Sequence, residues 1–187
     1  SVRVHSNDLR RMDLMRRAGG GAGAAAGRSA GMAAVDDQRA AAEGADGDRA
    51  LPEVLDVLLV DDEPALRSTL AEVLSQGGHR VTTAADGAAA LAEMVARVFD
   101  LVICDVQLPR LDGLSLFRRL RRESPGTDVI LMTAYGEVAD AVNALKEGAY
   151  DYLTKPFDLD ELLVQVERIG MQRALRRDLE QARAELS

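Results

Sequence analysis

The stretch Val57-Leu58-Leu59-Val60-Asp61-Asp62 places two carboxylates directly after four consecutive apolar residues. Such a short apolar run is typical of a parallel strand that is covered on both faces. Leu101–Cys104 and Val129–Met132 are runs of the same kind, so we expect these three segments at the centre of a sheet. Val81–Ala84 and Tyr150–Thr154 mix polar and apolar positions, as strands at a sheet edge do. The sequence therefore predicts five strands.

Helical periodicities lie between these strands. Start and stop signals predict helices from Pro64 to Gly77, Asp86 to Val98, Asp112-Gly113 to Pro125, Val138 to Gly148, and from a capping box of Asp158 and Glu161 onward. In the second helix the apolar period directs Ala88, Leu91, Val95 and Val98 inward. Alternating strands and helices predict a parallel sheet with helices on both faces. The edge-like second and fifth strands favour the order 2-1-3-4-5, a flavodoxin-like, doubly wound (βα)₅ fold of the α/β class.

Polar side chains stand at the carboxyl ends of the strands. Asp61 and Asp62 follow the first strand, Asp105 the third, Thr133 the fourth and Lys155 the fifth. In this fold such side chains converge on one crevice. Three carboxylates within about 4–5 Å of one another would repel by roughly 4 kcal/mol per pair at an effective dielectric near 20. They need a cation, and oxygen ligands with open positions suit Mg²⁺.

The remaining polar groups suit a phosphoryl group. An ammonium and a hydroxyl beside a metal, here Lys155 and Thr133, stabilise the spread-out charge of a phosphoryl group. Asp105 stands alone after the middle strand, so it is the best candidate for a nucleophile that forms a mixed anhydride. Pro156 disfavours helical torsions at Lys155 and keeps this lysine at a strand end.

Four motifs in this order resemble the receiver domain of two-component response regulators, over about residues 54–170. They are Val60–Pro64, Asp105–Gly113, Met132–Gly136 and Tyr150–Phe157. Separations of 43, 28 and 22 residues between Asp62, Asp105, Thr133 and Lys155 make the combination specific. The stretch from Met132 to Leu162 is most similar to receivers of NtrC-type, sigma-54-dependent activators.

The resemblance implies a chemistry for the acidic residues. A sensor histidine kinase would transfer a phosphoryl group to Asp105, the phosphoacceptor. Asp62, Asp105 and the backbone carbonyl of Gln107 would ligate Mg²⁺, and Asp61 would do so mainly through water. The chain would not be an enzyme beyond its own phosphorylation and dephosphorylation.

The resemblance also implies a switch. Thr133, Ala134 and Lys155 would bind the phosphoryl group, and Thr133 with Tyr152 would pass the change to the face formed by the fourth helix, fifth strand and fifth helix. The expected function is phosphorylation-dependent control of an output domain or a partner, and the expected output is the regulation of transcription. A stand-alone receiver, acting as a phosphorelay intermediate or protein-binding module, is the alternative.

An aspartyl-phosphate hydrolase is the rival from another class. It usually needs a second acid two residues after the nucleophile, where this chain has Gln107, and an amide cannot act as general acid or base. Gln107 and Tyr135 are instead expected to flank the path of water toward the phosphorylated Asp105.

Composition divides the 187 residues into three parts. Residues 1–50 hold 8 of the 16 glycines, 13 alanines and no aromatic residue, which predicts a disordered extension over residues 1–52. The receiver is predicted over 53–170. In 171–187, Leu175, Leu179, Ala182 and Leu186 follow one another at spacings of 4, 3 and 4, which predicts a linker helix or short coiled coil. A homodimer could form through this helix or the switch face.

Charge and cysteine content restrict the partners. Residues 51–170 carry 11 basic and 21 acidic side chains, which disfavours direct binding of nucleic acid. Cys104 is the one cysteine, expected in the core, and fits a reducing, cytoplasmic location. No apolar run approaches the roughly 18–20 residues of a membrane span. His5 and His79 lack partners at ligand spacing and are expected at the surface. No ATPase or helix-turn-helix output domain fits the remaining residues, so we expect a fragment of a longer regulator or a stand-alone receiver.

Overall fold

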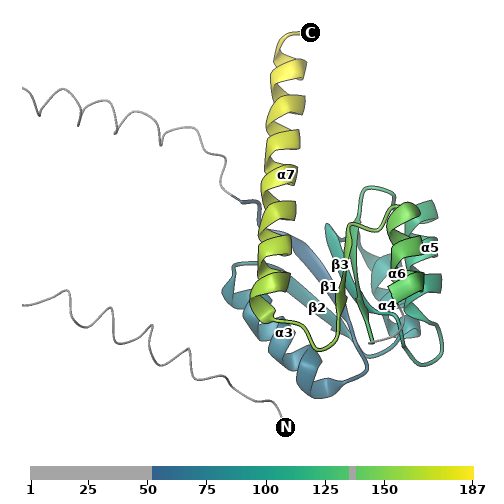
Figure 1. Cartoon of the computed structure of the whole chain (residues 1–187). Coiled ribbons are helices and arrows are strands. Elements are labelled where there is room, and N and C mark those ends of the chain that lie inside the picture. The colour runs from purple at the N-terminus through teal and green to yellow at the C-terminus, as the bar shows by residue number, and fades with distance from the viewer. Residues whose placement is uncertain (1–51, 135–137) are drawn as a thin grey trace, which may run out of the picture. The chain divides into compact units, whose positions relative to one another are not determined.

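A computed structural model describes residues 52–134 and 138–187 of the chain. Five parallel strands form one sheet in the order β2-β1-β3-β4-β5, which confirms the predicted fold and strand order (Figure 1). The strands are β1 (Asp56–Val60), β2 (Arg80–Ala84), β3 (Leu101–Asp105), β4 (Asp128–Thr133) and β5 (Asp151–Thr154). The helices are α3 (Pro64–Gln76), α4 (Gly87–Ala96), α5 (Gly113–Glu123), α6 (Val138–Lys146) and α7 (Leu159–Glu185). The predicted extension, apart from Pro52, lies outside the described residues.

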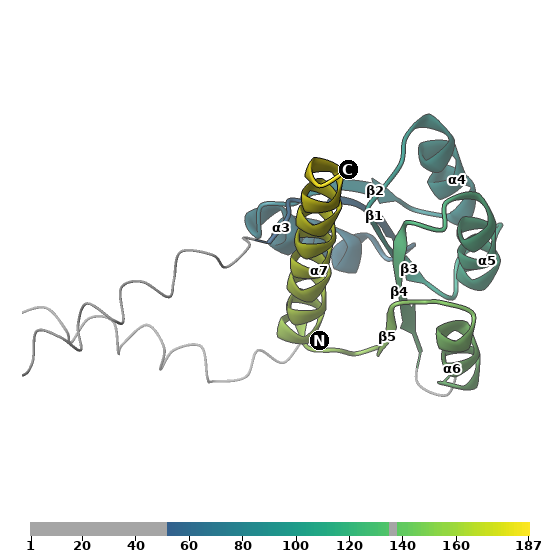
Figure 2. The ribbon, with the colours of Figure 1, turned by 90° about the horizontal axis from the view of Figure 1, so that it is seen from above.

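Helices cover both faces of the sheet, α3 and α7 on one side and α4, α5 and α6 on the other (Figure 2). Successive strand residues point to opposite faces, so each strand supplies both layers of the core. In β1, Leu58 and Val60 belong to the layer under α4 and α5, whereas Val57 and Leu59 belong to the layer under α3 and α7. This two-sided burial explains why the central strands have unbroken apolar sequences.

Local signals set the helix starts. Pro64 is the first residue of α3, and the carboxylates of Asp86 and Asp112 accept backbone N–H groups of α4 and α5 at 2.8 and 2.9 Å. Asp158 also caps its helix, but it accepts the N–H of Asp160 at 3.0 Å. The predicted capping box, in which Asp158 would bond the N–H of Glu161, is therefore wrong in its partner.

The predicted inner face of α4 is wrong. Three of its four members are exposed: Ala88, Val95 and Val98. Val95 is 82 % exposed because the buried side of the helix is formed by Ala90 with Leu91 and Met94 packed beside it. The helix ends at Ala96, and Phe99 fills the core position that the pattern assigned to Val98. Val142 of α6, also predicted inward, is 38 % exposed.

The last helix runs without interruption through the residue at which its pattern changes. Gly170 lies inside α7 and is buried, and a Cβ atom there would lie 3.1 Å from the carbonyl oxygen of Glu53. Burial along α7 ends at Ala174, and every residue from Leu175 onward is exposed. Figure 1 shows this C-terminal part projecting beyond the sheet. No helix among the described residues has the length and apolarity to cross a membrane.

The structure also shows the surroundings of Cys104 and His79. Cys104 is buried, as predicted, and burial raises the pKa of its thiol far above the ordinary value. His79 is not a plain surface residue, because it is half-buried and its Nδ1 accepts the N–H of Leu55 at 3.2 Å. The sequence contains no signal for this contact, since the two residues are 24 positions apart.

Candidate functional site

The predicted polar residues gather at the carboxyl edge of the sheet. Asp61 follows β1, Asp105 and Thr133 end β3 and β4, and Lys155 follows β5. The strand register places these ends side by side, with Asp105 opposite Met132 and Thr133 opposite Thr154. These residues therefore lie around one crevice, as the strand order led us to expect.

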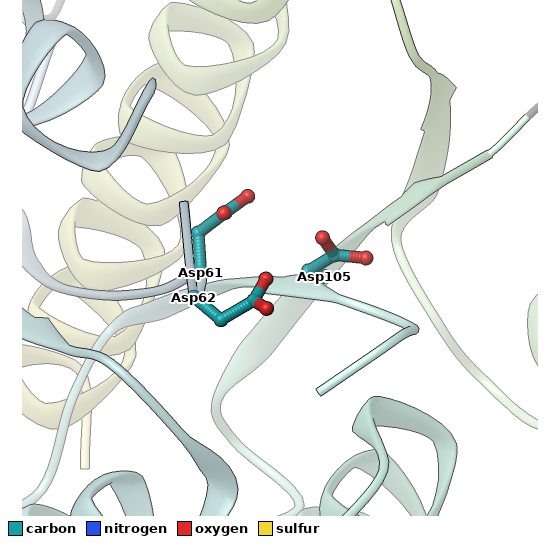
Figure 3. Close-up of side chains that lie close together, drawn as sticks. All are labelled: Asp61, Asp62 and Asp105. Carbon is teal, nitrogen blue, oxygen red and sulfur yellow. The ribbon is translucent and has the colours of Figure 1, made fainter. Parts of the chain in front are cut away.

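Three carboxylates form the acidic part of the site. Asp61, Asp62 and Asp105 each offer an oxygen, and these oxygens all lie within 4.8 Å of one another (Figure 3). Asp61 is fully buried, Asp105 is 6 % exposed, and Asp62 is exposed. Like charges at this spacing repel strongly, and a set of carboxylate oxygens with an open side is suited to a hard divalent cation. The cluster could thus hold a metal ion.

Backbone and side-chain contacts fix the orientation of these carboxylates. Asp61 Oδ1 accepts the N–H of Glu63 at 2.8 Å, and Asp105 Oδ1 accepts the N–H of Gln107 at 2.9 Å. Arg67 Nη1 donates to the backbone carbonyl of Asp61 at 2.6 Å and so supports the loop after β1. Arg67 had escaped sequence reasoning, because a lone arginine on a surface helix gives no sign of such a contact.

Lys155 joins two of the three carboxylates. Its Nζ donates to Asp61 Oδ2 at 2.7 Å and to Asp105 Oδ2 at 2.5 Å. Burial alone would lower the pKa of Lys155, but these two carboxylates outweigh it, and the pKa is raised. Burial raises the pKa of Asp105, and the hydrogen bonds from Lys155 and the Gln107 amide offset only part of that rise. One ammonium facing three carboxylates leaves the crevice with an excess of negative charge.

Thr133 brings an unpaired hydroxyl into the site. Its side chain is fully buried, and Oγ1 has no hydrogen-bond partner among the described residues, which leave out 135–137. The backbone carbonyl of Thr133 accepts the N–H of Lys155 at 2.7 Å, so the hydroxyl belongs to the residue beside the lysine. A buried polar group without a partner typically costs about 1–3 kcal/mol. A ligand that presents an acceptor oxygen here would relieve that cost.

The loop after β3 is held by close backbone packing. A Cβ atom on Gly113 would lie 2.1 Å from the backbone carbonyl oxygen of Asp105, and a Cβ on Gly87 would lie 2.4 Å from that of Leu111. The sequence pattern indicates Gly113 only as part of a helix start. Its larger role is to let α5 approach the residue that carries the central carboxylate.

The other predicted site residues are placed as follows. Tyr152 in β5 is half-buried and packs against the core layer under α4 and α5. Ala134 is half-buried directly after Thr133, and Gln107 is exposed after Asp105. Tyr135 lies outside the described residues, so its predicted shielding of the site stays a prediction.

The chain is similar to known proteins over most of the described part. Residues 57–167 match the family described as the response regulator receiver domain. Over 114 residues the chain is 44 % identical to the transcriptional regulatory protein TcrA of Mycobacterium tuberculosis, covering 61 % of this chain and 45 % of TcrA. Over 126 residues it is 41 % identical to the nitrogen assimilation regulatory protein NtrX of Azorhizobium caulinodans, covering 66 % of this chain and 28 % of that protein.

The chain is also similar in structure to a protein whose structure has been solved. NtrX from Brucella abortus, determined in complex with ATP, superimposes with a TM-score of 0.62 at 37 % identity, covering 68 % of this chain and 29 % of that one. The chain thus spans less than half the length of the curated relatives that it matches.

Proposed function

The chain belongs to the response regulator receiver domain family, and we propose that it is a phosphorylation-dependent switch in which Asp105 accepts a phosphoryl group from a sensor histidine kinase. One observation carries the proposal: Asp105 lies between two further carboxylates, the ammonium of Lys155 and the strand that ends in the unpartnered hydroxyl of Thr133. A nucleophile, a cation site and donors for phosphoryl oxygens are the parts that phosphoryl transfer needs.

In the transfer, an oxygen of Asp105 forms a bond to phosphorus while the bond from phosphorus to the kinase's histidine nitrogen breaks. The imidazole leaves with the electron pair of that bond. Lys155 already donates to Asp105, so its ammonium is in place to bind the added phosphoryl oxygens. Asp105 has to react as the carboxylate, and the ammonium of Lys155 stabilises that form although burial opposes it.

The carboxylate cluster fits Mg²⁺, because hard oxygen ligands with an open side are what this ion prefers. Asp62, Asp105 and the backbone carbonyl of Gln107 would hold the ion, with Asp61 contributing mainly through water. When bound, Mg²⁺ supplies positive charge against the phosphoryl oxygens. The chain's own residues would position the phosphoryl group, since Thr133 ends β4, Ala134 follows it and Lys155 follows β5.

The switch is proposed to start at Thr133. Its buried hydroxyl has no partner within residues 52–134 and 138–187, so it can donate to a phosphoryl oxygen without breaking a hydrogen bond to any of them. The space that the hydroxyl leaves would admit the ring of Tyr152, which lies one strand away in β5. The surface formed by α6, β5 and α7 would then change shape and alter the binding of an output domain or partner.

We propose transcription as the output, because the relatives TcrA and NtrX are named as regulatory proteins. The proposed setting is the cytoplasm, without direct contact between this part of the chain and nucleic acid. A stand-alone receiver that relays phosphoryl groups would use the same site. Hydrolysis of external phosphoesters is disfavoured, because Gln107 stands where a general acid would be needed.

A homodimer is proposed through the switch surface or the projecting part of α7. Leu175 and Leu179 are 57 % and 53 % exposed, and they lie at coiled-coil core positions with Ala182 and Leu186. If Leu175 and Ala182 occupy d positions and Leu179 and Leu186 occupy a positions, then Asp178 lies at a g position and Arg183 at the next e position. Opposite charges at these positions attract in a parallel pair, whereas an antiparallel pair would bring like charges together.

Phosphorylation of the full chain tests the proposal. Incubation with acetyl phosphate and Mg²⁺ should add one phosphoryl group per chain, detected by intact mass, and excess chelator should prevent it. Asp105→Asn should remove the reaction. Asp112→Asn is the matched control, because asparagine caps a helix as well as aspartate does and Asp112 is outside the carboxylate cluster. Undiminished labelling of Asp105→Asn would contradict the assignment.

A further inference from the structure

A cleft lies where β5 meets the beginning of α7, and its lining contains none of the three clustered carboxylates. Its volume is about 460 Å³, and its lining includes the carboxylates of Asp151, Asp158 and Glu161 but no lysine or arginine. Figure 2 shows the loop that leads from β5 into α7 at this position. The phosphorylation chemistry proposed above uses none of these three acids.

The carboxylates of the cleft lack cationic partners. Asp151 and Asp158 each use one oxygen to accept a backbone N–H, from Tyr152 at 2.8 Å and from Asp160 at 3.0 Å. Within residues 52–134 and 138–187, none of the ion pairs involves these two acids or Glu161. The cleft therefore offers acceptors and negative charge without compensation from the described protein.

Gln165 adds an independent sign that a donor is missing. It belongs to the lining of the cleft, is 7 % exposed, and its buried Oε1 has no hydrogen-bond partner in the part of the chain that the structure describes. A buried acceptor left unpaired destabilises a fold, so such groups usually have a partner in the functional state. A ligand that donates hydrogen bonds would serve the carboxylates, and it would serve Gln165 as well once the side-chain amide turns its oxygen toward the cleft.

The spacing of the acids argues for an organic cation. Among the described residues, the one group of three acidic, histidine or cysteine side chains with ligand atoms within 4.8 Å is Asp61, Asp62 and Asp105. The acids of the cleft are thus too widely spread to coordinate one metal ion together. A guanidinium group carries five N–H donors on a planar frame and can reach several separated acceptors, whereas an ammonium is a compact point charge.

The aromatic lining favours the same ligand. Tyr152 and Phe157 are both part of the wall of the cleft, and guanidinium groups stack on aromatic rings. We propose that this cleft binds an arginine side chain of a partner protein, with Gln165 and the surrounding carboxylates accepting its hydrogen bonds. The cleft is open to solvent on the surface that the switch would change, which suits a side chain inserted by a docked protein.

Phosphorylation of Asp105 would change the affinity of this cleft for arginine, because residues of its wall belong to the proposed switch. This consequence rests on the proposed function. Tyr152 is the proposed switch aromatic, and Thr154, also in the lining, directly precedes Lys155. A movement of the Tyr152 ring would change the shape of the cleft and the affinity for arginine. Binding to the unphosphorylated chain does not depend on that coupling.

A titration of the ¹⁵N-labelled full chain with acetyl-Gly-Arg-Gly-amide, followed by NMR, tests the proposal. The amide signals of Tyr152, Thr154 and Gln165 should shift in a saturable way. The same peptide with citrulline, which is nearly isosteric but uncharged, should bind at least about tenfold more weakly, equivalent to about 1.4 kcal/mol. Equal binding of the citrulline peptide, or the absence of saturable shifts with arginine, would overturn the proposal.

Two variants locate the site. Gln165→Met keeps the side-chain length and removes the acceptor, and Glu161→Gln removes a charge at an exposed position. Each should weaken arginine-peptide binding several-fold, while Glu185→Gln at the other end of α7 should not. Full affinity in both Gln165→Met and Glu161→Gln would refute the assignment. If beryllofluoride leaves peptide affinity unchanged in the native chain, the coupling is refuted and the arginine site stands.

Discussion

Lys155 Nζ lies 2.5 Å from Asp105 Oδ2, although the two residues are 50 positions apart in the chain. The contact places a permanent positive charge at the residue proposed to receive a phosphoryl group. Lys155 also pairs with Asp61, but one ammonium against the three carboxylates of the cluster leaves an excess of negative charge. The carboxylates of the crevice therefore repel one another, and a bound cation would relieve this repulsion.

Mg²⁺ should raise the melting temperature of the chain. An ion that binds only the folded state stabilises it by mass action, by about 2.7 kcal/mol when its concentration is 100 times Kd. Asp62→Asn should reduce the shift, because it replaces one of the three clustered carboxylates by a neutral amide, which attracts the ion less strongly. Asp178→Asn, on the exposed end of α7, is the control and should respond like the native chain. A full Mg²⁺ response in Asp62→Asn, measured by calorimetry, would mean that the ion binds elsewhere.

Thr133→Ala should separate phosphorylation from its consequence. The hydroxyl has no partner among the described residues, so its removal relieves a desolvation cost, whereas loss of the buried Cγ2 methyl destabilises, and the two effects should leave only a small net change in stability. Acetyl phosphate should still label Asp105, but the amide shifts that beryllofluoride induces over residues 139–146 should shrink by at least about half. Thr133→Ser keeps the hydroxyl and should retain most of the response. An equally large response of α6 in Thr133→Ala would disprove the coupling.

Gly113→Ala should damage both stability and the site. The new methyl group would lie 2.1 Å from the backbone oxygen of Asp105, and that backbone has to move. Overpacking of this kind destabilises by about 1–3 kcal/mol or more. Gly126→Ala is the matched control, because nothing lies within 4 Å of a Cβ there, and its effect should stay within about 1 kcal/mol. Urea unfolding of the two variants gives the comparison, and similar losses in both would refute the packing argument.

His79 should make stability depend on pH. Burial lowers the pKa of His79 below the ordinary value of 6.5, so on acidification the unfolded chain takes up this proton before the folded chain does. The contribution is therefore fully present above about pH 6.5 and is lost as pH falls toward the lower pKa of the folded state. Replacing His79 by Gln should flatten the pH dependence of unfolding between about pH 7 and 5.

The second histidine provides the control for this experiment. His5→Gln should leave the pH dependence as it is in the native chain. If His5→Gln flattens the curve and His79→Gln does not, the titrating group is not the one that accepts the N–H of Leu55.

The fold and the crevice were predictable because both follow from rules that act along the chain. Unbroken apolar runs such as 101–104 reveal buried parallel strands, and in a doubly wound sheet their carboxyl ends must meet. Asp61, Asp105 and Lys155 could therefore be brought together from strand order alone. Caps such as Asp86 were predictable for the same reason, since their contacts are local.

The predictions failed in two situations. In one, the apolar residues of a helix do not single out one side as the buried side; in the other, the contact joins residues that are far apart in the sequence. The segment that forms α4 contains one charged residue, Glu93, so its apolar period could not decide which side faces the sheet. The exposure of Val95 followed from how the helix packs, not from its composition. The contact of Gly113 with Asp105 and the unpaired oxygen of Gln165 depend on neighbours that only the folded chain supplies.

Chemical mapping of the phosphorylated residue tests the central claim most directly. An acyl phosphate is reduced by borohydride to an alcohol, so a phosphorylated aspartate becomes homoserine and is recognised by mass spectrometry of the digested chain. After treatment with acetyl phosphate and Mg²⁺, the account predicts homoserine in place of Asp105 and unchanged Asp61 and Asp62. Homoserine at Asp61 or Asp62, or a phosphorylated chain in which Asp105 survives reduction, would contradict it.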